Sequence, residues 1–483
     1  MRHVVLFIVL IISVSKIQAQ FSGTNLMEYQ YGKLPDSEDE NFHALYNKLR
    51  LNYRFKGLKV NAGVQFYQTP YSERNYVDAS WLGLNYRKKG WEFKAGNFNE
   101  TLGRGILLRS YEIQGAILED KGYRSKQYFY RDILGASVGF KNKKFSVKAL
   151  WGYALNNVYP PTEEWDKRRS DELAAFYGDY TLYKQTIGAS VIRIKNSLED
   201  SYYGMGSMSG RIWPFLNYYS AYAVSLNGKD GGFDAQTHAI YGSLNLALSK
   251  FGVSLEVKDY NNFLLGSGIN EPPALIREHS YRVLNRSTHV LQPQNETGFQ
   301  VEAFYQPSIN TVLTLNHTRA NNDFGITFDY KEWFFELSTM VGELTEFKGF
   351  MDYADDPFKG EMKRYSGGVN VDRTIKNDYG LKLEVELQTF DREGKSTQNY
   401  VGGLTFRYKS KLFVNALSEW SNDAFVTDSK KIWLGSNVRY KLNGRNNLQL
   451  FAGERRGGPA CSAGICYEVL DFKGVELRWT SRF

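Results

Sequence analysis

Hydrophobic and polar residues alternate one by one along much of this chain. The clearest segment, 381–389, places Leu or Val at every second position up to Leu387, with Lys, Glu or Gln between them. Such alternation predicts a β-strand with one apolar face and one polar face. Comparable segments recur at 49–55, 58–66, 240–248 and 412–420. The repetition predicts an all-β protein built of antiparallel hairpins.

The connections between these segments are of two lengths. Short polar turns lie at 56–57, 87–90, 141–144, 249–252 and 443–444, whereas long connections cover 31–42, 155–169, 261–296 and 342–363. This combination is typical of a single transmembrane antiparallel β-barrel, with short turns in the periplasm and long loops outside the cell. Keeping every short turn on one side leaves Glu112–Asp120 and Phe215–Leu226 out of the barrel. It predicts about 22 strands, within a range of about 18–24.

The start of the chain has the pattern of a cleavable export signal. Arg2 precedes an apolar run over Val4–Val14, and Ala19 supplies a small residue at the cleavage boundary. The run is too short to cross a bilayer, which takes about 20 apolar residues, and no later segment reaches that length. We therefore expect a signal peptide at 1–19 and a mature barrel at 20–483.

The composition agrees with a membrane barrel. The chain contains 34 Tyr, 31 Phe and 44 Gly but only 11 Pro, a bias typical of strands and of aromatic girdles at membrane interfaces. The formal charge of +8 falls to +6 without Arg2 and Lys16, which is too small to indicate nucleic-acid binding.

The last segment, 475–483, alternates and places Trp479 and Phe483 on its apolar face. This pattern looks like the signal that the barrel assembly machinery recognises in its clients. We therefore expect the outer membrane of a Gram-negative bacterium as the location. The expected partners are outer-membrane lipid, lipopolysaccharide and the barrel assembly machinery, with other outer-membrane proteins as further candidates.

Cys461 and Cys466 lie close together in the last long connection. In an exported protein two neighbouring cysteines favour a disulfide. Free thiols and a metal site are the alternatives, although two thiolates with no nearby His supply only half of a tetrahedral site. No other residues have metal-ligand spacing, so we expect neither a metal nor a cofactor.

The connection from Phe98 to Arg131 is too long for a simple loop and carries an apolar run between Arg104 and Arg109. Apolar residues in a loop need cover, and a barrel of this size encloses a lumen wide enough to hold the segment. We expect 98–131, and also 198–234, to fold inward, with Arg104 and Arg109 at a constriction of the lumen. An external cap packed on neighbouring loops is the alternative.

The connection 261–296 carries a cluster of basic residues that could bind an anionic ligand: Arg277, His279, Arg282 and Arg286. A catalytic site is a second hypothesis, because His279 precedes Ser280, but adjacent residues of an extended chain point to opposite faces. A structured loop held by polar hydrogen bonds is the third. We expect no enzymatic activity.

Several short motifs carry a family resemblance. Gly96–Phe98 precedes Gly103–Arg109, Pro272–Leu275 precedes Glu278–Ser280 and Leu284–Arg286, and Arg456–Pro459 precedes Cys461 and Cys466. In these stretches the chain resembles an uncharacterised family of outer-membrane β-barrels from Bacteroidetes, a domain-of-unknown-function family. The resemblance implies a barrel over most of the mature chain and carries no known activity.

These observations leave two functional hypotheses. The first is a porin-like conduit for small polar solutes, whose range is set by charged residues that line the lumen. The second is a non-transport scaffold or a subunit of an outer-membrane protein assembly. We do not expect active uptake coupled through an N-terminal plug domain, because the strand pattern starts near Phe21.

Overall fold

The computed structural model describes residues 20–33, 41–120, 122–156, 168–228, 232–376, 378–423, 432–462 and 465–483. For residues 376, 460–462 and 465–466 it describes the backbone alone. The expected signal peptide at 1–19 lies outside this part of the chain and stays a prediction.

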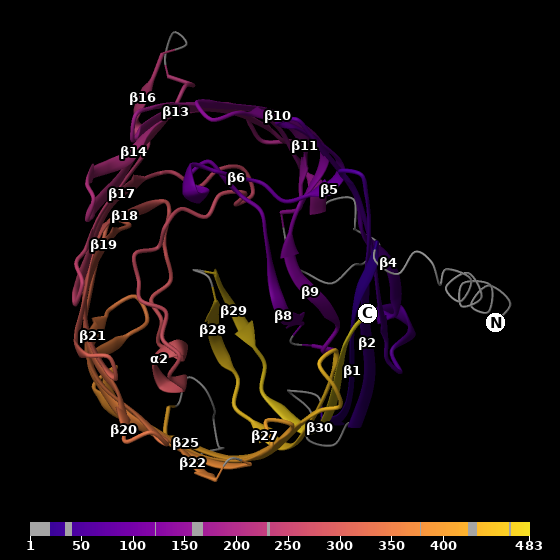
Figure 1. Cartoon of the computed structure of the whole chain (residues 1–483), viewed down its shortest axis with the longest axis vertical. Helices are drawn as coiled ribbons and strands as arrows, with labels where there is room; N and C mark the ends of the chain where they lie inside the picture. Colours follow the sequence, from indigo (N-terminus) through magenta and orange to yellow (C-terminus); the bar gives the residue numbers. More distant parts are fainter. Residues whose placement is uncertain are drawn as a thin grey trace, which may run out of the picture.

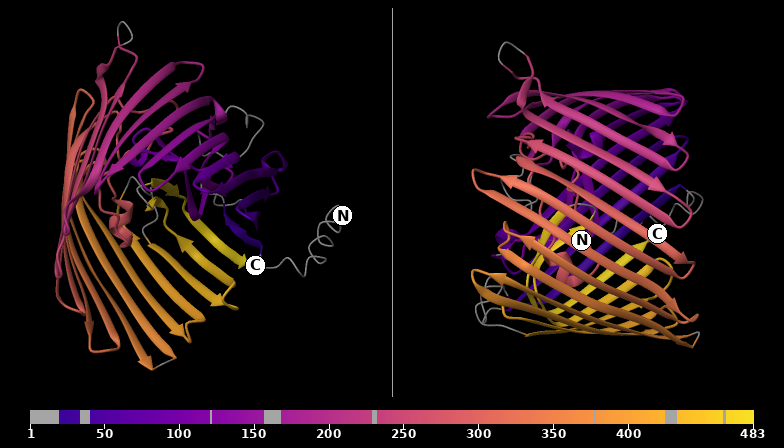
Figure 2. Two further views of the ribbon diagram at one scale, coloured as in Figure 1. Left: turned by 45° about the horizontal axis from the view of Figure 1, so that its top comes forward. Right: turned by 90° about the vertical axis from the view of Figure 1, so that its left-hand side faces the viewer.

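Within these described ranges, twenty-four strands form one antiparallel sheet that closes on itself, because β1 (Phe21–Lys33) pairs with both β2 and β30 (Phe472–Arg482). Figure 1 shows the resulting ring, and Figure 2 shows its strands running obliquely across the wall. The other strands of the sheet are β2 (Asn41–Phe55), β3 (Leu58–Gln68), β4 (Tyr76–Lys88), β5 (Trp91–Phe98), β10 (Ile133–Lys141), β11 (Phe145–Ala154), β12 (Asp171–Leu182), β13 (Gln185–Lys195), β14 (Asp200–Trp213), β15 (Leu216–Ser225), β16 (Asp234–Ala247), β17 (Phe251–Asn261), β18 (Asn295–Ser308), β19 (Thr311–Asp323), β20 (Thr327–Val341), β21 (Thr345–Asp356), β22 (Glu361–Lys376), β23 (Tyr379–Arg392), β24 (Lys395–Tyr408), β25 (Leu412–Ser421), β26 (Ile432–Lys441) and β27 (Asn446–Arg455).

The all-β barrel is confirmed, and its 24 strands lie at the upper end of the expected range. Segment 112–120 stays out of the barrel sheet, as expected. The expected inward fold of 198–234 is wrong, because this region supplies the wall strands β14 and β15. Its membrane-facing positions include Gly204, Gly206 and Ser220, so the apolar alternation is weak. The expected long connection 342–363 is also wrong, since it contains β21.

The outward face of the wall is apolar. On β23, Leu381, Leu383, Val385 and Leu387 point outward and are 38–49 % exposed. Outward-facing aromatic residues such as Trp91 and Phe145 lie near the ends of their strands. Among the described residues, no helix is long and apolar enough to span a bilayer.

The solvent exposure of the inward-facing side chains changes along each strand. In β2, Phe42, Ala44 and Tyr46 are at most 1 % exposed near the long connections, whereas Arg54 near the short turn is exposed. The burial patterns of β13, β19 and β23 show the same gradient. The half of the lumen near the long connections is therefore lined by covered side chains, and the half near the short turns is open to solvent.

Three connections supply this cover, and together we call them the inner layer. The first, 99–132, contains β6 (Thr101–Leu102), the turn η2 (Gly103–Gly105), β7 (Leu108–Arg109), β8 (Tyr111–Glu119) and β9 (Lys126–Arg131). The second, 262–294, contains α2 (Arg282–Arg286), and the third, 456–471, contains the hairpin β28 (Gly458–Ser462) and β29 (Ile465–Val469). Figure 1 shows all three inside the ring. A further turn, η1 (Ser72–Arg74), precedes β4.

Candidate functional site

The three inner segments contact one another in pairs. The backbone N–H of Arg109 donates to the carbonyl of Ile269 over 3.0 Å and joins the first segment to the second. Arg286 donates to the carbonyl of Arg456 over 3.3 Å and joins the second to the third. The Phe129 and Tyr467 rings, 5.3 Å apart, join the third to the first. The inner layer is therefore one connected structure.

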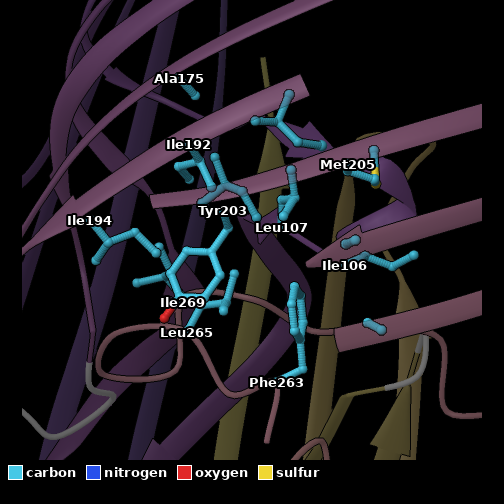
Figure 3. Close-up of a cluster of buried hydrophobic side chains, with 14 of the residues drawn as sticks. Ile106, Leu107, Ala175, Ile192, Ile194, Tyr203, Met205, Phe263, Leu265 and Ile269 are labelled. Atoms are coloured by element: carbon cyan, nitrogen blue, oxygen red, sulfur yellow. The ribbon is translucent and has the colours of Figure 1, made fainter. Parts of the chain in front are cut away.

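The first inner segment covers an apolar part of the wall. On β12 to β14 the inward-facing residues include Leu173, Ile192 and Met205, which would be costly to leave in water. Ile106 and Leu107 pack onto them and are 0 % exposed. Figure 3 shows Ile106, Leu107, Ile192 and Met205 together with Phe263, Leu265 and Ile269 of the second segment. The apolar run that the sequence singled out thus forms a core inside the barrel.

The hairpin β8–β9 is held to the wall by buried ion pairs. Lys126, 1 % exposed, contacts Glu28 of β1 and lies 3.1 Å from Glu119. Glu28 also accepts a hydrogen bond from Nε of Arg478 in β30 over 2.8 Å. Burial alone would raise the pKa of Glu119, but Lys126 and Arg124 hold it below its usual value. The hairpin therefore links the first and last strands of the barrel.

The second inner segment crosses a row of glutamates on the wall. Glu332 lies 3.2 Å from Nε2 of His279, and Glu386 accepts from the backbone N–H of Val283 over 3.0 Å. The remaining contacts are Arg277 to Glu302, Tyr281 to Glu336 over 2.7 Å, and Arg286 to Glu419 over 2.5 Å. Each glutamate comes from a strand between β18 and β25, so the segment is fixed strand by strand.

These contacts bear on the hypotheses for the basic cluster. Arg277, His279 and Arg286 are engaged by wall carboxylates, which favours the structured loop over a common anion site. Arg282 is exposed on α2 inside the barrel, and so is Ser280. The ring of His279 packs against Phe334 at 4.5 Å. A local pair of Ser280 and His279 aimed at one substrate is not formed.

A second buried cluster closes the end of this segment. Lys258 and Glu296 form an ion pair in which both side chains are 0 % exposed. His289 lies 3.2 Å from Asp356 through Nδ1 and 3.8 Å from Glu296 through Nε2. Burial lowers the pKa of His289, but the hydrogen bonds to Asp356 and Glu296 outweigh it and raise the pKa above its usual value.

The two arginines expected at a constriction are bound to the inner layer and the wall. Arg104 adopts a left-handed backbone conformation, with φ of 56°, and its guanidinium lies 3.8 Å from the centre of the Tyr219 ring. It also donates to Ser243 over 3.2 Å. Arg109 and Arg131 lower the pKa of Glu271, but burial outweighs them and leaves it raised.

The remaining expected site residues lie at the seam and in the third inner segment. Trp479 points outward on β30, and the Phe483 ring lies 6.5 Å from Phe21. Cys461 and Cys466 stand directly opposite each other in the β28–β29 register. Their side chains lie outside the described part of the chain, so the disulfide stays a prediction. The described residues contain no group of three or more His, Cys, Asp or Glu placed to hold a metal ion.

Charged residues were expected along the lumen, but the individual groups near the short turns were not identified from the sequence. Arg54, Lys59 and Arg87 occupy inward positions on β2, β3 and β4, at the open end of the lumen. Glu256 and Glu302 occupy inward positions near the middle of β17 and β18, beside the second inner segment. The signal that could have found them is polarity at every second strand position, read together with the strand order around the ring.

A closed antiparallel barrel with an apolar outward face satisfies every backbone polar group within a bilayer, which an open sheet cannot do. With its charged lumen and inward-folded connections, the chain is an outer-membrane β-barrel of the porin-like class.

Comparisons with solved structures find proteins of partly similar architecture at low sequence identity. The chain is similar to the translocation pore of the P pilus usher PapC, with 8 % identity, coverage of 96 % of this chain and 99 % of that chain, and a TM-score of 0.47. Acinetobacter baumannii OccAB3 is 11 % identical, with coverage of 70 % of this chain and 94 % of that chain and a TM-score of 0.40. Pseudomonas aeruginosa OpdL is 12 % identical, with coverage of 69 % of this chain and 93 % of that chain and a TM-score of 0.43. No protein-family model and no curated protein matches. The resemblance to the Bacteroidetes family stays a prediction.

Proposed function

We propose that this protein is a passive conduit for small polar solutes, narrowed in its outer half by the inner layer. The observation that carries the proposal is solvent exposure inside the barrel: Ser280 and Arg282 of the second inner segment are exposed, and so is Arg54 on the wall. Water therefore reaches both the inner layer and the open half of the lumen. The buried ion pairs hold the inner layer in place, so the passage has a fixed border rather than a mobile plug.

The first test is the single-channel current of the full barrel in a planar bilayer. Discrete open steps are expected. Deleting 98–131 is a poor test, because it would leave Lys48 buried without Glu112 and would remove one partner each from Glu28 and Arg50. A silent intact barrel would overturn the conduit and favour the scaffold hypothesis.

A second test locates the passage. Arg282→Cys, labelled with a bulky maleimide, should reduce the open current, because α2 borders the water-filled space. The matched control is Tyr183→Cys, which lies in a short turn outside the lumen and is 94 % exposed. Parallel labelling of the unsubstituted protein accounts for Cys461 and Cys466. Equal currents before and after labelling of Arg282→Cys would contradict this route.

We further propose that outer-membrane lipid surrounds the apolar wall and that the barrel assembly machinery binds the last strand. The outward positions of Trp479 and Val475 on β30 support this assignment. No enzymatic activity is proposed, because His279 is used in a contact with Glu332 of the wall and forms no pair with Ser280.

A further inference from the structure

Two like charges face each other on the lumenal wall near the short turns. Arg54 of β2 and Lys59 of β3 are directly opposite in register. Both point into the lumen, since their neighbour Phe55 is exposed on the membrane face. Like charges in this position destabilise a sheet. Within the described residues, no carboxylate forms an ion pair with either side chain, so the unfavourable pair is left uncompensated.

The positive charge extends beyond this pair. Arg50 and Arg87 add positive charge near Lys59, although Arg50 is paired with Glu112 and Arg87 with Glu92. A cleft of about 680 Å³ continues the surface around the short turns and contains Glu92 and Asp179 as its acidic residues. Its basic residues are Arg87, Lys88, Lys89, Lys141 and Lys148, of which Arg87 pairs with Glu92 and Lys148 with Glu100 over 2.8 Å. We call the surface of Arg54, Lys59 and this cleft the basic sector.

The opposite side of the ring carries acidic side chains instead of basic ones. The strand order places β17, β18 and β20 across from β2 to β4, and Figure 1 shows the two groups on opposite sides. Glu256 there accepts from the Tyr241 hydroxyl over 2.6 Å, and Glu336 accepts from the Tyr281 hydroxyl over 2.7 Å. Arg277 of the inner layer pairs with Glu302. The inner layer thus engages part of the acidic wall, whereas the basic pair of Arg54 and Lys59 has no such partner.

We propose that the basic sector makes the conduit selective for anions and that its solutes carry carboxylate or phosphate groups. The inference rests on the conduit proposed above. A wall of one charge sign raises the local concentration of oppositely charged solutes, and this effect reaches about 10 Å into 0.1 M salt but only about 3 Å into 1 M salt. Because Arg54 and Lys59 face the lumen, lipid head groups in the membrane do not neutralise them.

The test is the reversal potential of the full barrel in a tenfold KCl gradient, repeated with potassium phosphate and potassium citrate. The intact protein should pass chloride in preference to potassium, and less so in 1 M salt. In the double variant Arg54→Gln/Lys59→Gln the chloride-to-potassium permeability ratio should fall about twofold or more. The matched control is Lys250→Gln/Lys409→Gln, which removes the same charge from exposed short turns elsewhere on the rim.

The outcomes separate the two proposals. A silent barrel would refute the conduit itself. An open barrel without anion preference, or one in which the two double variants shift the reversal potential equally, would overturn the basic sector while leaving the conduit intact. Current carried by chloride but not by phosphate or citrate would restrict the solutes to inorganic halides and contradict the assigned chemical class.

Discussion

Lys126→Met removes one partner of a buried ion pair and should lower the stability of the barrel. Lys126 and Glu28 are each 1 % exposed, and their contact joins the lumenal hairpin to β1. Removing one partner of a buried ion pair costs about 3–5 kcal/mol, because the other charge stays buried. We expect the lower part of this range, since Glu28 keeps Arg478 as a partner.

The magnitude can be measured by urea unfolding of the barrel refolded into vesicles of fixed composition. With a slope of about 2 kcal/mol per molar urea, a loss of about 3 kcal/mol lowers the midpoint by about 1.5 M. The double variant Glu28→Gln/Lys126→Met should be at least as stable as Lys126→Met, because it removes both charges of the pair while the amide oxygen can still accept from Arg478, which also keeps Glu476 at 3.9 Å.

Arg193→Gln provides the surface control. It disrupts an ion pair with Asp200 in which both side chains are more than a third exposed, so the midpoint should not change measurably. The reasoning is refuted if Lys126→Met unfolds at the same urea concentration as the unsubstituted barrel, or if the double variant is the least stable of the series.

Three further predictions concern other parts of the barrel. Asp356 and Glu296 raise the pKa of His289, so its charged form stabilises the second inner segment below the ordinary pKa of 6.5. This stabilisation is lost as pH rises through the raised pKa. Hydrogen exchange of 262–294 should therefore increase over that pH interval, and His289→Gln should abolish the pH dependence. Arg286→Ala frees α2 from Glu419 and should increase open-channel noise, whereas unchanged noise would contradict the anchoring role. Phe483→Ala removes the ring that lies against Phe21; it should lower the yield of heat-modifiable barrel without lowering export, and equal yields would exclude the assembly role.

The wall of this barrel could be predicted because its information is local. On β23 the membrane-facing positions are apolar and the lumenal positions are polar, so the pattern of one strand is enough. The failure at β14 and β15 has the same cause, since outward Gly and Ser residues remove the apolar signal. The inward position of the first inner segment followed from its apolar run, which needs cover wherever the chain goes.

The contacts of the inner layer could not be predicted from one sequence. Arg277 meets a glutamate 25 residues away, His279 one 53 residues away, and Arg286 one 133 residues away. A glutamate at an inward strand position looks the same whether it faces water or a loop. The basic cluster therefore suggested an external ligand, although its partners lie within the chain.

The position of the hairpin β8–β9 has a consequence for how the barrel reaches its closed form. Closing the seam directly joins Glu28 to Arg478 across 450 residues, and contacts of such long range are slow to form. The hairpin touches both edges, because Lys126 is 98 residues from Glu28 and the carbonyl of Gly115 is 363 residues from Arg478. One contact between residues 450 positions apart is thus replaced by two contacts of shorter sequence separation. The residues that fill the lumen therefore also act as the template on which the wall is completed.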